Sequence, residues 1–481
     1  MYKNTHDHEQ RRTTTRAPSP VRELVSKYVN CNLTETQIKN LLVVDCPSTS
    51  IPRNQLSNLI NYTRRKNNPD IFSVYDFNQW CINHSYDENS LHSTFIPYYY
   101  INDINDIFVL FATKQLLKDA QSSTLLQVDA TYKLTWNELP LLVFGSSDVD
   151  RHFRPFGVAL ISSDETSTCY IDLFKQLKLI STQENQREYV VNYVMADGAP
   201  GITSAQKEVF PQARRLMCWA HVARKCREHR KLVPTEKWKQ IDIDIHNLQL
   251  CFSDNIFSHG TNLLMKKWST DPLIQQFQSY FFNQWIETLP LWYEGAAINM
   301  PLTNNGCKSL NFIIKKKYTM RNKLHLSSFL PKIEQMLNDW SAASSSNVFV
   351  SKPSISSDLE LCAFKWSNNI DKLAVLHWFD SWYIVPSSNS LITPAVWLQM
   401  YQLQRWSSFD GLVIWLKSCR LVSPLFSCTC PTGLKYYVCK HSVGLAMMLN
   451  QYEVNDKTRL QLLGKRRGKG RSKKVQSALL L

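Results

Sequence analysis

The stretch "TLLQVDATYKL", residues 124–134, decides the fold class, because it places an acidic residue inside an apolar, strand-like run. It opens a series of strand-like and helical runs that are separated by turn residues. The strand-like runs are "LPLLVFGSSDVD" (139–150), "FRPFGVALISSDE" (153–165), "EYVVNYVMADGAP" (188–200) and "RRLMCWAHV" (214–222), and the helical runs are "STCYIDLFKQLKLI" (167–180) and "GITSAQKEVF" (201–210). Three closely spaced strands, followed by alternating helices and strands, predict an α/β fold with a mixed sheet flanked by helices.

Two aspartates in this region need an explanation, because aspartate is depleted in strands and costly to bury without a partner. Asp129 lies inside the run that opens the region, and Asp197 closes a later one. An aspartate at a strand end can cap the turn that follows, and this explanation is sufficient for Asp197 taken by itself. It explains Asp129 poorly, because no helix start follows that residue. Two carboxylates on neighbouring strands can instead share hard divalent cations, the arrangement used for in-line phosphoryl transfer.

Composition sets the class of partner. The 481 residues suffice for two to four domains, and the formal net charge of +15 favours a polyanion, most simply nucleic acid, although a generic basic surface fits as well. No unbroken apolar run reaches membrane-spanning length, and the N-terminus lacks the apolar centre of a signal peptide. The 13 cysteines are unevenly spaced, which indicates a reducing compartment and makes a local Cys/His cluster a candidate metal site.

The N-terminal part is expected to be helical. Residues 1–20 read as a disordered lead and residues 21–118 as a helical region. Within that region, "TETQIKNLL" (34–42) and "PRNQLSNLINYTRRKN" (52–67) each combine a helix start with an apolar stripe. The two helices could form a helix-turn-helix that reads DNA or a plain packing layer, and the residues alone leave both alternatives open.

A metal-ligand pattern stands near the C-terminus in "FSCTCPTGLKYYVCKHSVGLAMML", residues 426–449. Two cysteines one residue apart are followed, after eight residues, by a cysteine and a histidine at the same spacing. The four residues are Cys428, Cys430, Cys439 and His441. Three thiolates and an imidazole close a tetrahedral zinc shell, so we expect a structural Zn²⁺, a turn at "PTG" and a helix directly after the histidine.

A lysine occupies an unexpected place in "PLTNNGCKSLN", residues 301–311. The polar residues at its start predict a helix N-terminus with Asn305 as the cap, which puts Lys308 at the third helical position. A capping box and the helix dipole both favour an acid there. The local sequence therefore favours an anion where the chain has a cation.

The region from Gln127 to Leu330 resembles the Mutator-like element (MULE) transposases, whose catalytic domain has an RNase H-like fold and a DDE triad. The resemblance rests on "VDATYKL", "PLLVFGSSD", "FGVALISSDET", "MADGAPGITSAQKEVFPQARRLMCWAHV", "WYEGA" and "TNNGCKSLN". It implies that Asp129 and Asp197 are the first two catalytic acids, which would hold Mg²⁺ or Mn²⁺, and that Lys308 stands where the third acid, a glutamate, is expected. The carboxylates that could replace it are Glu294, Asp148, Asp150 and Glu165.

The same resemblance matches Cys218 and His221 to a Cys-x-x-His pair of the family, a possible second metal or structural pair. Cys226 and His229 repeat that spacing, and chance or a local structural role is the alternative for them. The C-terminal cluster resembles the SWIM zinc finger, which often follows the catalytic domain in these transposases. Candidate DNA-binding cations are Lys315, Lys316, Lys317, Arg321, Lys465, Arg466 and Arg467.

The expected domains and function follow from these features. A transposase-like domain spans 119–335 with a helical insertion at about 227–295, then come a Ser-rich joint and helical segment (336–424), a SWIM-type finger (425–450) and a basic tail (460–481). The resemblance implies a zinc-binding DNA transposase that acts on terminal repeats and target DNA in the nucleus, outside membranes, and is impaired by Lys308. The alternatives are a non-enzymatic DNA-binding protein derived from a transposase and a SWIM-based protein-interaction module; a homo-oligomer is possible in each case.

Overall fold

The computed structural model describes residues 17–31, 33–47, 50–66, 68–85, 90–162, 165–346, 349–388 and 390–459. Within these ranges the chain forms two compact units. The first contains the described residues up to His229, together with Phe281–Trp292 and Met300–Ser351. The second contains Arg230–Tyr280, Tyr293–Asn299 and the described residues from Lys352 onward, so the chain passes between the units several times.

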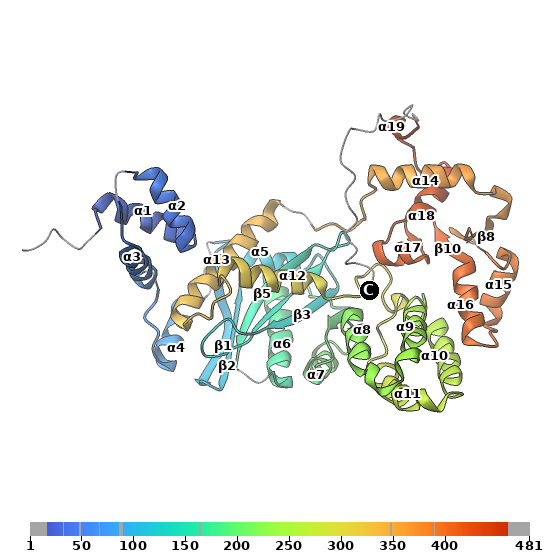
Figure 1. Cartoon of the computed structure of the whole chain (residues 1–481), viewed down its shortest axis with the longest axis horizontal. Helices are drawn as coiled ribbons and strands as arrows, with labels where there is room; N and C mark the ends of the chain where they lie inside the picture. The colour runs from blue at the N-terminus through green and yellow to red at the C-terminus, as the bar shows by residue number, and fades with distance from the viewer. Residues whose placement is uncertain are drawn as a thin grey trace, which may run out of the picture. The chain divides into compact units, whose positions relative to one another are not determined.

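A seven-stranded mixed sheet forms the centre of the first unit (Figure 1). Its strands are, in spatial order, β1 (Phe95–Asp103), β2 (Asp106–Ala112), β5 (Phe153–Ile161), β4 (Leu141–Ser147), β3 (Leu125–Thr131), β6 (Tyr193–Ala196) and β7 (Arg214–Met217). Neighbours from β1 to β3 are antiparallel, whereas β3, β6 and β7 are parallel. The predicted mixed α/β sheet is confirmed.

Helices cover both faces of this sheet, because side chains alternate between the two faces along each strand. On one face, Leu126 and Val128 pack with α6 (Ser167–Asn185) and α7 (Pro200–Val209). On the other, Leu141 and Val143 pack with α4 (Val74–Asn83) and α13 (Leu326–Ser346). The helix α5 (Lys114–Ala120) contributes to both cores.

The predicted helical region 21–118 is only partly helical, since its last part forms β1 and β2. These strands make an antiparallel hairpin joined by the short segment Ile104–Asn105, and β2 continues the sheet by pairing with β5. The apolar run of β2 is buried at every position but its first. Short apolar runs look alike in strands and buried helices, so the sequence pattern did not separate them.

The helices α1 (Ser19–Asn30), α2 (Glu35–Asp45) and α3 (Arg53–Lys66) pack together around a core of their own. Thr34 and Gln37 form a capping box at the start of α2, as the sequence motif predicts. The expected disordered lead lies, up to residue 16, outside the described residues, and Ser19 already begins α1.

The second unit combines the insertion with the C-terminal region. The insertion forms α9 (Thr235–Gln249), α10 (Asp254–Trp268) and most of α11 (Gln275–Phe281). The C-terminal region forms α14 (Ser357–Asn369), β8 (Leu376–Phe379), β9 (Trp382–Pro386), α15 (Pro394–Leu403), α16 (Phe409–Ser418), β10 (Cys419–Ser423), β11 (Ser427–Cys428), α17 (Pro431–Tyr436), α18 (Lys440–Met448) and α19 (Asp456–Arg459). The segment 336–424, expected to be a joint and helices, thus also supplies three strands of a four-stranded sheet.

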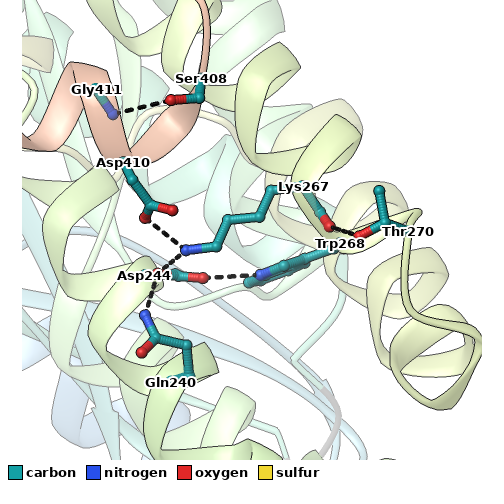
Figure 2. Close-up of polar contacts among 8 residues, drawn as sticks. All are labelled: Gln240, Asp244, Lys267, Trp268, Thr270, Ser408, Asp410 and Gly411. Carbon is teal, nitrogen blue, oxygen red and sulfur yellow. Dashed lines mark hydrogen bonds and ion pairs between the residues drawn. The ribbon is translucent and has the colours of Figure 1, made fainter.

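A buried acid joins the insertion to the C-terminal region (Figure 2). Asp244 on α9 is 1% exposed and accepts hydrogen bonds from Lys267 Nζ at 3.1 Å and Trp268 Nε1 at 3.1 Å. The Lys267 ammonium also reaches Asp410 on α16 at 2.7 Å. One cation therefore ties two helices of the insertion to a helix some 140 residues later.

Candidate active site and zinc centre

Strand register brings the two predicted acids together. In the parallel pair of β3 and β6, Leu125 pairs with Tyr193 and Gln127 with Met195. Because side chains alternate along a strand, the same register places Asp129 beside Asp197, on the face to which Gln127 points. The carboxyl ends of parallel strands are where an open α/β sheet presents its ligands.

The helix α12 (Asn305–Ile313) is fixed against this edge by two asparagines and a glutamine. Asn304 is fully buried and donates from Nδ2 to Val128 O at 2.8 Å, while Gln127 Nε2 donates to Asn304 Oδ1 at 3.4 Å. At the other end of the helix, Asn311 Nδ2 donates to Asp129 Oδ2 at 2.8 Å. These bonds hold α12 on β3 at both ends.

The predicted cap of this helix was wrong by one residue. Asn304 is the N-cap and its side chain makes no capping bond, because that side chain is used to reach β3. Lys308 is consequently the fourth helical residue rather than the third. The helix start also lies so close to the sheet that a Cβ at Gly306 would be 2.8 Å from Phe153 Cβ, which makes glycine necessary there.

The charge of Lys308 acts on the first acid. Burial raises the pKa of Asp129 to about 7, and the Lys308 ammonium opposes that rise, while the charges of Asp197 and Glu165 add to it. The Asn311 hydrogen bond also favours the ionised carboxylate. The site thus contains two carboxylates and one ammonium in place of the three carboxylates of a DDE triad.

The donor set fits a divalent cation only in part. Carboxylate oxygens of Asp129 and Asp197 are suitable ligands for Mg²⁺ or Mn²⁺. An ammonium has no lone pair to donate and repels a cation, so Lys308 does not fit the role of a third ligand. Among the described residues, the C-terminal cluster brings three or more potential metal ligands close together. Within that part of the chain, the acid pair does not belong to such a group.

Of the four carboxylates that could replace the third acid, the structure places Glu165 near the pair. Glu165 precedes α6, at the end of the sheet where β5 runs parallel to β3, and the charge of Asp197 acts on it. Burial raises its pKa, its carboxylate accepts a hydrogen bond from Tyr170 Oη, and its Oε1 is buried without a partner. It is the candidate whose electrostatics couple to both acids.

The other three carboxylates are a structural acid, Asp148, its neighbour Asp150, and Glu294 of the second unit. Asp148 is 1% exposed and binds Arg154 at 3.4 Å and the backbone N–H of His152 at 2.8 Å, in the β4–β5 connection that also contains Asp150. Glu294 belongs to the second unit, where its Oε1 accepts from Gln249 Nε2 at 2.7 Å.

The Cys-x-x-His pair borders this site. Cys218 is the N-cap of α8 (Trp219–Glu228), and its Sγ accepts a hydrogen bond from Asn304 N at 3.2 Å, which ties α8 to the start of α12. His221 is 7% exposed, and burial and the Lys308 charge lower its pKa to about 4, so it is neutral at pH 7. Its Nδ1 is buried without a partner. Among the described residues, neither this pair nor Cys226 and His229 belongs to a group of three or more potential metal ligands that lie close together.

Arg215 is a site residue that the sequence reasoning missed. It lies on β7, is 9% exposed, and donates to the carbonyl oxygens of Asp197 and of Leu216. Burial lowers its pKa to about 10, and the nearby Asp197 charge opposes that fall. A charged residue inside the run "RRLM" was the available signal, since a buried arginine needs a partner.

The four predicted zinc ligands converge in the second unit. The ligand atoms of Cys428, Cys430, Cys439 and His441 all lie within 4.8 Å of one another, and His441 Nδ1 is 3.7 Å from Cys428 Sγ and 3.6 Å from Cys439 Sγ. Hydrogen bonds from the Cys428 and Cys430 thiols hold the pKa of Cys439 well below its usual value. Three sulfurs and one nitrogen that converge in this way suit tetrahedral Zn²⁺.

The surroundings of this cluster differ in two respects from the expectation. The segment "PTG" does not form a turn but starts α17, and the next helix, α18, begins one residue before His441. A Cβ at Gly433 would lie 2.4 Å from Cys428 O, so the first pair of ligands requires glycine there. The Trp366 ring stands edge-on to the His441 ring, with 5.3 Å between centroids.

The predicted DNA-binding lysines and arginines differ in exposure and in whether their charge is paired. Lys317 bonds to Asp339 Oδ2 at 2.7 Å, so its charge is partly neutralised. Lys316 and Arg321 are exposed and both approach the half-exposed Phe312 ring, at 6.0 and 5.4 Å from its centroid. Lys315 is half-buried, whereas Lys465, Arg466 and Arg467 lie outside the described residues.

The mixed sheet, its flanking helices and the acids at the ends of adjacent parallel strands define an RNase H-like α/β domain. Residues 125–225 match the MULE transposase domain family, and the chain therefore carries a MULE transposase domain. No curated protein matches the chain. The match ends before α12, so Lys308 and the cysteine cluster lie beyond the matched residues. Among the described residues no helix is long and apolar enough to cross a membrane.

Proposed function

We propose that the protein is a zinc-binding DNA transposase of the Mutator-like class whose metal-dependent cleavage and strand transfer are impaired by Lys308. The observation that carries this proposal is the position of Asp129 on β3 and of Asp197 directly after the adjacent parallel strand β6 of the matched domain, with the Lys308 ammonium acting on Asp129. The geometry supports the acid pair, and the ammonium is the reason for impairment.

Coulomb's law gives the scale of such a repulsion at close range. Two unit charges ~4 Å apart interact by about 4 kcal/mol at an effective dielectric constant of 20, and a divalent ion roughly doubles this value. A site that also lacks one of three ligands would bind a metal ion weakly. Asp129, with a pKa near 7, is moreover protonated in about half of the molecules at neutral pH in the absence of a metal.

The partners follow from the class. We propose the terminal repeats of the element and its target DNA as substrates, Mg²⁺ or Mn²⁺ as the ions of an active site restored to three acids, and Zn²⁺ as the structural ion of a SWIM-type finger. Location in the nucleus and assembly into a homo-oligomer are both compatible with a DNA transposase. The exposed Lys316 and Arg321 beside Phe312 support contact with phosphates.

The test is a cleavage and strand-transfer assay with Mn²⁺ on DNA that carries the ends of the element. It compares the unmodified protein with Lys308→Glu and with Lys308→Glu/Asp129→Ala. We expect that only the Lys308→Glu protein is active, because its glutamate supplies the missing ligand and removes the repulsion. Lys308→Gln is the matched control, since it removes the charge without adding a ligand.

Three outcomes contradict this proposal in different ways. If the unmodified protein cleaves as fast as Lys308→Glu and needs Asp129, another carboxylate completes the site, and Glu165→Gln then identifies it. If all variants bind DNA in a salt-dependent way and none cleaves, the second candidate holds: a non-enzymatic, zinc-dependent DNA-binding protein, which the observed lysine favours. Negligible DNA affinity would instead support a SWIM-based protein-interaction module.

A further inference from the structure

The outward face of α3 carries a row of side chains that the catalytic domain does not use. Asn54, Asn58, Asn61 and Arg65 are all exposed, whereas Leu56, Ile60 and Thr63 of the same helix are buried. The helix belongs to the N-terminal three-helix module, which consists of α1, α2 and α3.

Helical geometry puts these residues on one narrow face. With about 100° between successive residues, positions 54, 58, 61 and 65 fall within an arc of about 60°. The buried positions 56, 60 and 63 fall within a similar arc on the opposite side. The row therefore points directly away from the core of the module.

The core fixes this orientation. Leu56 and Ile60 pack with Val21 and Val25 of α1 and Ile38 of α2. Arg64 is held inward, where its Nη2 donates to Leu33 O at 3.3 Å and burial lowers the pKa of the guanidinium. Arg65, the next residue along the helix, is exposed, as is Lys66.

The charge of the module is concentrated on this helix. The sequence of α3, "RNQLSNLINYTRRK", contains four cations and no acid, and three of the cations lie in its last turn. The helix α1, by contrast, carries one acid, Glu23, and α2 carries two, Glu35 and Asp45. A face of amides with cations at its end complements a polyanion that also presents hydrogen-bonding edges, which is the surface of the DNA major groove.

We propose that α3 is a recognition helix that enters the major groove of double-stranded DNA, with Asn54, Asn58 and Asn61 contacting base edges and Arg65 contacting a guanine or a phosphate. An asparagine amide forms paired hydrogen bonds with N6 and N7 of adenine, so the face selects sites rich in A·T pairs. This inference adds a specific DNA reader to the proposed function and rests on it only in taking DNA as the partner.

The experiment is a selection of bound duplexes from a pool with a randomised core, carried out with the full chain loaded with zinc. The unmodified protein should enrich a short motif that contains adenines. The Asn54→Ala/Asn58→Ala/Asn61→Ala variant should lose that motif, with affinity for the selected duplex at least tenfold lower and affinity for the unselected pool within a factor of three. Asn40→Ala, an exposed asparagine on α2, is the matched control and should select the same motif.

The remaining outcomes overturn the inference, and they show whether the proposed function fails with it. Enrichment of one motif by both the unmodified protein and the triple variant would place recognition elsewhere. Binding of the pool without any enrichment would refute a reading helix and leave the transposase proposal standing. Preference for single strands, or absence of DNA binding with a circular dichroism spectrum of a folded protein, would also refute it, and the latter result would refute the proposed function as well.

Discussion

Asn311 donates a hydrogen bond of 2.8 Å from Nδ2 to Asp129 Oδ2, and Lys308 lies one helical turn before it on α12. The bond fixes how α12 faces the first acid. The position of Lys308 on this fixed helix lets its charge act on Asp129. The lysine in place of an acid therefore changes the pKa of that carboxyl group.

Replacing Lys308 by methionine should raise the pKa of Asp129 further above 7, because the ammonium favours the ionised carboxylate. Asn311→Leu should change it in the same direction, since a hydrogen bond to the charged form is lost. Carbon-13 NMR titration of the carboxyl group, assigned with Asp129→Asn, measures both. An unchanged pKa in Lys308→Met would show that the ammonium points away from the acid.

Stability should fall as the pH rises from about 4 to about 7. The folded state keeps Asp129 protonated up to a pKa near 7, whereas the unfolded chain releases that proton near 3.9, so the folded state binds more protons in this window. The full effect is about 4 kcal/mol by linkage. Urea unfolding at pH 5 and pH 8 should show a smaller loss in Asp129→Asn, and equal losses in the two proteins would refute the raised pKa.

Loss of zinc should loosen the C-terminal cluster and leave the mixed sheet intact. Cys439→Ser removes one of four converging ligands, and the helix that packs on them through Trp366 loses its partner. Hydrogen–deuterium exchange should increase in residues 425–449 and in α14 but not in β3 and β6. Cys362→Ser, at an exposed cysteine on α14, is the control and should leave exchange unchanged.

Lys267→Met should destabilise the second unit by about 2–4 kcal/mol, because it leaves the buried Asp244 carboxylate without its cation. Asp410→Asn removes the partner whose side chain is 68% exposed and should cost less than about 1 kcal/mol. Denaturant unfolding of both variants measures the difference. Equal losses would mean that the bond to Asp410, and not the burial of Asp244, gives the network its strength.

Lys316→Ala/Arg321→Ala should weaken binding to unselected duplex DNA, since both cations are exposed beside Phe312. If each contacts one phosphate, the slope of log K against log salt concentration should shrink by about 1.8. Fluorescence anisotropy at several salt concentrations measures this slope. Lys317→Ala, which removes a cation already paired with Asp339, should change it less.

Local patterns in the sequence predicted a large part of the fold. The runs that contain β3 to β7 and the helices α6 and α7 were recognised because each has its own period of apolar residues. The strands β1 and β2 were missed, because short apolar runs look alike in strands and in buried helices. The cap of α12 was misplaced because Asn304 bonds to β3 rather than to its own helix.

The sequence by itself determined the identity of the groups: two acids in apolar strands, a lysine in place of the third acid, and four zinc ligands whose spacing brings them together locally. Only the tertiary structure decided how these groups meet. The β3–β6 register, the Asn311 bond and the packing of α3 join residues far apart in the chain, and the energies of such contacts depend on burial and direction, which spacing does not contain.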